Sequence, residues 1–122
     1  MKRKSNSTSS ITVKFSDTES SAISSALDFL LHSEEFSYEA KKFSWEHASR
    51  AAWKVDDHVA QYTRTEIRAM SAAIDYALHS VKESPSTVAK VENLFPALIP
   101  DLKESVSTLE ILSIRFHAYI AK

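Results

Sequence analysis

Two segments of this 122-residue chain, 15–33 and 62–80, have closely similar sequences. They read FSDTESSAISSALDFLLHS and YTRTEIRAMSAAIDYALHS, and at a constant offset of 47 they share nine identical residues out of 19 without a gap. Independent amphipathic helices share residue types, but they seldom share this many identities. We interpret the match as an internal duplication. Because no third copy follows, the sequence does not predict a solenoid, which needs three or more units.

Both segments contain the sequence pattern of a helix start. Ser16 and Glu19 have the spacing of a capping box, in which each side chain binds a free backbone amide of the first turn, and Thr63 and Glu66 repeat it. Apolar residues then recur at three- and four-residue intervals after each cap. The pattern predicts two amphipathic helices that begin at equivalent positions.

The sequence outside these segments is also typical of helices. Residues 37–61 contain no Pro and have an apolar stripe at near four-residue spacing, which predicts one long helix. The pair Ser84–Pro85 predicts the start of a short helix that Pro96 ends. Asp101 and Glu104 repeat the capping-box spacing and predict a last helix. We expect this last helix to turn five apolar residues toward the core: Leu102, Val106, Leu109, Phe116 and Ile120.

The predicted fold class is therefore all-α, a four-to-five-helix up-down bundle with short links that favour antiparallel neighbours. Ile11, Val13 and Phe15 alternate with polar residues, which predicts a short extended segment before the first helix. Residues 1–10 are basic and serine-rich, and we expect them to form a flexible arm. Residues 11–122 are predicted to form a single helical domain.

The chain contains no glycine and no cysteine. Without glycine there is no Walker loop, dinucleotide fingerprint or nucleophile elbow, and without cysteine there is no disulfide or thiolate ligand. We therefore predict that the chain is not an enzyme and uses no cofactor or metal. No apolar run approaches the 18 residues of a membrane span, and serines follow the basic start where a signal peptide has an apolar stretch. The expected location is the cytoplasm.

The matching segments also repeat an Asp and a His four residues apart, Asp28/His32 and Asp75/His79. These residues fall almost opposite the apolar arc of each helix, so we expect solvent-facing ion pairs rather than a metal or acid–base site.

Three further histidines lie on or beside predicted apolar faces. His47 and His58 flank the stripe of the long helix, and His117 lies at the edge of the last helix's core face. Because no Glu-x-x-His pattern is present, we expect buried neutral histidines here, although His47 and His58 also remain candidates for a functional role.

The polar side of the first helix is small and uncharged, with serines where a solvated face usually has Lys and Glu. Small residues allow another helix to approach closely. Trp53 projects away from the apolar stripe of the long helix; it either covers a neighbouring element of its own chain or marks a partner surface, where Trp is enriched. The candidate partner-binding residues are Trp53, Ser21, Ser24, Ser25, Asp28 and His32.

These features favour a non-catalytic protein-interaction module, acting as a small accessory, inhibitor or immunity-type regulator. The expected partner is another protein, with a homodimer as one form of such an interaction. A formal net charge of −1 argues against wholesale non-specific binding to nucleic acid.

Residues 11–19, ITVKFSDTE, follow a basic start and resemble the strand-to-helix entry of ribbon-helix-helix repressors. In that family two chains pair their strands and outward residues read the DNA major groove. The resemblance covers fewer than 20 residues, and residues 59–62 of the second segment lack the basic alternation. It implies an alternative function as a DNA-binding regulator. The residues that would contact DNA are Lys2, Arg3, Lys4, Thr12 and Lys14.

Overall fold

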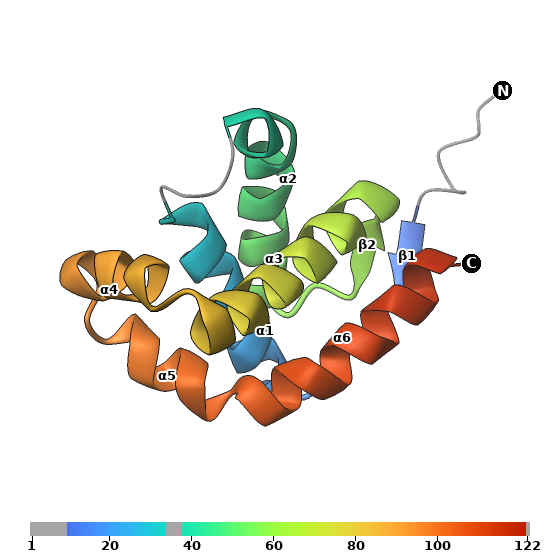
Figure 1. The fold of residues 1–122 in the computed structure, drawn as a ribbon. Coiled ribbons are helices and arrows are strands. Elements are labelled where there is room, and N and C mark those ends of the chain that lie inside the picture. Colours follow the sequence, from blue (N-terminus) through green and yellow to red (C-terminus); the bar gives the residue numbers. More distant parts are fainter. Residues whose placement is uncertain (1–9, 34–37, 122) are drawn as a thin grey trace, which may run out of the picture.

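The computed structural model describes residues 10–33 and 38–121, which form six helices and two short strands (Figure 1). In chain order the elements are β1 (Ser10–Thr12), α1 (Asp17–Leu31), α2 (Tyr38–Asp56), β2 (Gln61–Thr63), α3 (Arg64–Glu83), α4 (Pro85–Leu94), α5 (Leu98–Glu104) and α6 (Val106–Ala121). The predicted all-α bundle is confirmed, with six helices where the sequence predicts four to five. The predicted arm lies outside the described residues except for Ser10, which begins β1. No helix in the described ranges has the length and apolarity needed to cross a bilayer.

The two helices of the matching segments, α1 and α3, pack against each other at the centre of the molecule (Figure 1). Both also contact α2 on one side and α6 on the other. Ile23, Leu27, Ile74 and Phe116 are completely buried where these helices meet. Each such side chain stabilises the fold by about 1.5–3 kcal/mol through the apolar surface it removes from water. The helices of the two matching segments therefore lie at the centre of the core.

Both predicted capping boxes are confirmed. The Glu19 amide donates to Ser16 Oγ at 3.1 Å, and Glu19 Oε1 accepts from the Ser16 amide at 2.9 Å. The corresponding distances for Thr63 and Glu66 are 3.1 and 2.8 Å. Each box satisfies two backbone amides that the first helical turn leaves without partners, so both helices begin where the sequence places them.

The two caps differ in burial, because the end of α2 covers only the second one. Glu66 is fully buried, and its Oε1 also accepts a hydrogen bond from Lys54 Nζ at 2.7 Å. Lys54 Nζ donates in addition to the Gln61 carbonyl at 3.1 Å. Burial and the nearby Glu66 carboxylate raise the pKa of Tyr62 to about 12. A buried charge pair therefore joins α2, β2 and α3.

The strands β1 and β2 form an antiparallel ribbon in which Ile11 lies opposite Tyr62. The ribbon continues where the Val13 amide donates to the Ala60 carbonyl at 2.8 Å. Val13 and Ala60 are separated by the same offset that relates the two matching segments. The ribbon therefore brings together the two chain segments that lead into α1 and α3.

The predicted helix over 37–61 is wrong at its C-terminal end, because α2 ends at Asp56. His58 adopts a left-handed backbone with φ of 56°. The His58 amide donates to the Val55 carbonyl and the Val59 amide to the Lys54 carbonyl, which are the two bonds of a Schellman motif. In a chain without glycine, a histidine occupies the position that glycine usually takes. The residues that follow pair with β1, a distant partner that helical periodicity does not reveal.

The start of the predicted last helix is also corrected. Asp101 and Glu104 form no capping box, because both lie inside α5, which begins at Leu98 and contains Pro100 in its first turn, where Pro is tolerated. The Ser105 hydroxyl donates to the Asp101 carbonyl at 2.9 Å where α5 ends. In the predicted core face, Leu102, Leu109 and Phe116 are buried, whereas Val106 and Ile120 are only partly buried.

The short helix α4, which precedes α5, begins at Pro85, as predicted, and ends at Leu94 before Pro96. Ser84 occupies the N-cap position but makes no side-chain capping bond.

Candidate functional site

A groove of about 590 Å³ lies between α1, the C-terminal end of α2 and α5. The α1 side presents the small serines identified in the sequence, with Ser21 exposed, Ser24 half-buried and Ser25 at the floor with 8% of its surface exposed. The other walls include Val55 from α2 and Leu98 from α5. The groove thus has a polar floor of small side chains.

Four carboxylates line this groove: Asp17, Asp28, Asp56 and Asp101. Asp56 Oδ1 accepts a hydrogen bond from Ser24 Oγ at 3.0 Å. Within the part of the chain that the structure describes, none of the four forms a salt bridge with Lys or Arg, and no Lys or Arg lines the groove. Among the described residues, the groove lining therefore has four carboxyl groups and no basic Lys or Arg side chain to balance them.

The pKa of Asp28 is raised above its ordinary value. Burial is the larger cause, and the negative charge of Asp56 adds to it, while His32 acts in the opposite direction. Ionised Asp28 is therefore held at a cost in free energy. A cation placed in the groove would reduce that cost, since it offsets both the lost hydration and the repulsion between the two carboxylates.

The candidate partner-binding residues fall into two groups. Ser21, Ser24, Ser25 and Asp28 line the groove, whereas His32 and Trp53 do not. The His32 ring packs against the Phe95 ring at 4.0 Å between centroids. Trp53 is 58% exposed on α2, so most of its side chain remains open to solvent.

The predicted Asp–His pair is wrong in the second helix, whereas in the first helix the charge of His32 acts on Asp28 and lowers its pKa, as the sequence spacing predicts. Asp75 Oδ2 lies 2.7 Å from His117 Nε2, and its Oδ1 accepts from Ser113 Oγ at 2.7 Å. His79 lies 3.7 Å from Glu83 instead. Because α6 packs along this side of α3, the face that the sequence assigns to solvent finds partners on another helix.

The three other histidines also differ in burial from the sequence prediction. His58 and His117 are exposed rather than buried, and His47 is half-buried. His58 lies in the turn after α2 and lines the groove. No group of three or more His, Asp or Glu residues with metal-ligand geometry occurs in the two described ranges.

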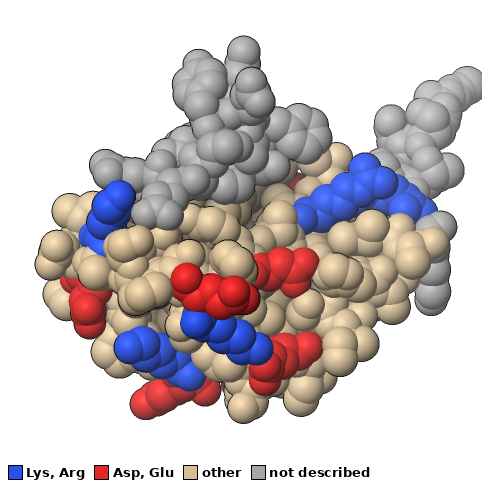
Figure 2. All heavy atoms as spheres, in the orientation of Figure 1, with Lys and Arg blue, Asp and Glu red and all other residues tan. Residues whose placement is uncertain are grey.

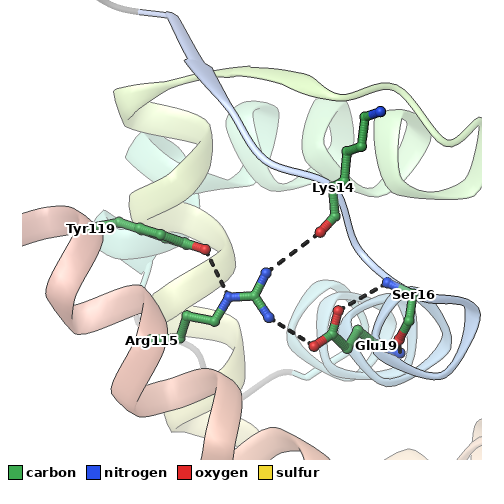
Figure 3. Close-up of polar contacts among 5 residues, drawn as sticks. All are labelled: Lys14, Ser16, Glu19, Arg115 and Tyr119. Carbon is green, nitrogen blue, oxygen red and sulfur yellow. Dashed lines mark hydrogen bonds and ion pairs between the residues drawn. The ribbon is translucent and has the colours of Figure 1, made fainter.

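Arg115 of α6 connects the C-terminal helix to the start of α1 (Figure 3). Its guanidinium donates to Glu19 at 2.7 Å, to the Tyr119 hydroxyl at 2.7 Å and to the Lys14 carbonyl at 3.5 Å. The Ser16 amide, followed by Arg115, lowers the pKa of Glu19. Sequence reasoning missed this cluster because Arg115 and Glu19 are 96 residues apart.

The ribbon presents a second polar surface. Thr12 and Gln61 lie opposite each other in the register and are exposed, as are Lys14, Arg64 and Arg68 nearby in the chain. Figure 2 shows Lys and Arg side chains gathered beside the part of the molecule where β1 and β2 lie. The basic residues nominated at the N-terminus, Lys2, Arg3 and Lys4, lie outside the described residues.

In comparisons with protein-family models, curated proteins and solved structures, the chain matches none of them.

Proposed function

We propose that the chain is a non-catalytic protein-binding module, an accessory, inhibitor or immunity-type regulator, that accepts a basic segment of a partner protein in the groove between α1 and α5. The observation that supports this function is the set of four carboxylates in a groove whose described lining contains no Lys or Arg. An excess of one charge in a concave site attracts the opposite charge and increases the rate of association.

The shape of the groove fits a peptide segment with one or two Lys or Arg side chains. Its volume of about 590 Å³ lies within the range of ligand sites, and the serine floor lets a backbone approach closely. The groove carboxylates accept the charged hydrogen bonds of a guanidinium or ammonium group, and Arg binds a carboxylate in two-pronged geometry. The same negative charge repels nucleic acid phosphates, which favours a protein partner at this surface.

The test is fluorescence anisotropy with a labelled Arg-rich peptide and a matched Glu-rich peptide. We expect only the Arg-rich peptide to bind. The double variant Asp28→Asn/Asp56→Asn should bind it about tenfold more weakly, since each exposed ion pair contributes up to about 1 kcal/mol.

The matched control is Glu83→Gln/Glu92→Gln, which removes the same charge from exposed positions outside the groove. We expect its affinity to stay within about twofold of the unmodified chain. Equal weakening by both double variants would show a general charge effect and contradict a groove site, as would failure of the Arg-rich peptide to bind.

The ribbon supports DNA binding as a second candidate function. Both strands come from one chain, whereas the repressors that residues 11–19 resemble pair strands from two chains. The hydrogen bond between Val13 and Ala60, two positions 47 residues apart, agrees with the interpretation that the matching segments are duplicated halves. In this arrangement the exposed side chains of Thr12 and Gln61 would face the DNA, with Lys14 beside them.

This second function predicts binding to duplex DNA that weakens steeply as salt rises. Lys14→Gln/Arg64→Gln should weaken binding and reduce the salt slope by about 2 if each side chain contacts one phosphate. The control Lys82→Gln/Lys103→Gln, whose positions lie on α3 and α5, should leave the slope unchanged. Gel-shift titrations at several salt concentrations provide the measurement, and identical slopes for both variants would exclude the ribbon as the DNA contact.

A further inference from the structure

One face of α6 is exposed and consists mostly of apolar and small side chains. It consists of five exposed residues at alternating intervals of four and three: Ser107, Ile111, Ile114, Ala118 and Ala121, which we call the α6 stripe. Ile111 and Ile114 are 66% and 75% exposed. The core side of the same helix is occupied by other residues, among them Leu112 and Phe116, both fully buried. The stripe is therefore a different face of α6 from the one that packs against its own chain.

The spacing of the stripe is that of a coiled-coil seam, where apolar residues recur on average every 3.5 positions. A surface helix that packs against its own protein on one side needs just one apolar face. A second apolar face with heptad spacing fits a second helix with the same spacing. The α6 stripe of a second copy of the chain has this spacing and provides such a helix.

The stripe is complementary to itself when two copies run antiparallel. With Ile114 placed opposite Ile114 of the other copy, Ile111 lies opposite Ala118, and Ser107 lies opposite Ala121. Large side chains then face small ones on both sides of the centre, which is the arrangement that fills a helix–helix interface without voids. A single twofold axis through Ile114 generates the whole contact, as an isologous interface requires.

Charges on the flanks agree with this arrangement. Glu110 and His117 flank the stripe on one side, and each has a partner at 2.7 Å in its own chain, Lys82 for Glu110 and Asp75 for His117. On the opposite flank Arg115 is engaged by Glu19 and Tyr119 of its own chain, which turns its charge away from the stripe. The flank residues are therefore paired within each chain, which leaves the stripe itself as the surface available to a second copy.

We propose that the α6 stripe is the interface of an antiparallel homodimer. This inference is independent of the proposed function, because no stripe residue lines the α1–α5 groove. The paired segment, Ser107–Ala121, is short, about 21 Å long, so the interface belongs to the small class, below about 1,200 Å². We therefore expect a weak dimer, because weak and transient contacts fall in this class.

Sedimentation velocity on the full chain, from about 1 to 200 μM, tests the dimer. We expect the weight-average sedimentation coefficient to rise with concentration. Ile114→Glu should remain monomeric throughout, with an unchanged circular dichroism spectrum because the side chain is exposed. The control Leu94→Glu, at a position 63% exposed on α4, should dimerise like the unmodified chain. A chain that stays monomeric at every concentration, or an Ile114→Glu variant that still dimerises, overturns the proposal.

Cysteine cross-linking tests the orientation, since the natural chain has no cysteine. In the antiparallel pairing, Ile114→Cys places its thiol next to the same thiol of the other copy, whereas Ile111→Cys faces Ala118. Under mild oxidation we expect Ile114→Cys to form disulfide-linked dimers at least tenfold faster than Ile111→Cys. Equal rates would indicate parallel pairing and overturn the proposed geometry.

Discussion

Glu66→Ala is expected to lower the free energy of unfolding by about 3–5 kcal/mol, because it breaks a buried ion pair by removing one partner. Glu66 is fully buried, whereas 18% of the Lys54 side chain is exposed. The substitution leaves the Lys54 ammonium and the Thr63 amide without the carboxylate oxygen that binds both. Urea denaturation at pH 7, followed by circular dichroism, gives the free energy of unfolding.

The matched control is Glu19→Ala, the equivalent cap in the first segment. Its side chain is 25% exposed and its ionic partner Arg115 is 33% exposed. Water can therefore replace much of the hydrogen bonding that is lost with the Glu19 carboxylate. The expected loss is about 1–2 kcal/mol. Similar losses for the two variants would contradict the greater burial of the second cap.

Phe116→Ala is expected to cost about 3–5 kcal/mol, the usual range for removing a buried aromatic side chain. Phe116 is fully buried and stacks on Phe15 at 5.8 Å between ring centroids, with Tyr119 at 5.5 Å on another side. The cavity would open between α6 and the segment that leads into α1. Urea denaturation at a protein concentration below the dimerisation range gives the loss for the single chain.

Leu94→Ala is the control for this substitution, since Leu94 is apolar but 63% exposed. Its cost should stay within about 0.5 kcal/mol. A loss in the free energy of unfolding for Phe116→Ala no larger than that for this control would contradict the packing of α6 on the core through Phe116.

Elements specified by neighbouring residues could be predicted from the sequence. The caps at Ser16 and Thr63 depend on a residue three positions away, and the apolar spacing of α1 and α3 identifies the faces that form the core. The end of α2 could not be predicted in this way. It depends on a left-handed His58 and on a strand whose partner, β1, lies about 50 residues earlier.

The candidate groove was only partly predictable for the same reason. Ser21, Ser24 and Asp28 lie on one helix, so their common face follows from helical geometry. Asp56 and Asp101 join them from α2 and α5, and the sequence pattern placed the end of one helix and the start of the other incorrectly. Contacts within a helix are encoded locally, whereas the walls of a groove depend on how separate helices pack.

The contact between Arg115 and the start of α1 has a consequence for synthesis of the chain. Glu19 emerges from the ribosome 96 residues before Arg115, a delay of about 5–20 s at ordinary translation rates. During that interval Phe15 lacks the Phe116 ring on which it stacks. α2 and α3 also pack against α1 and are made earlier, so the nascent chain leaves exposed only the part of its first helix that α5 and α6 later cover.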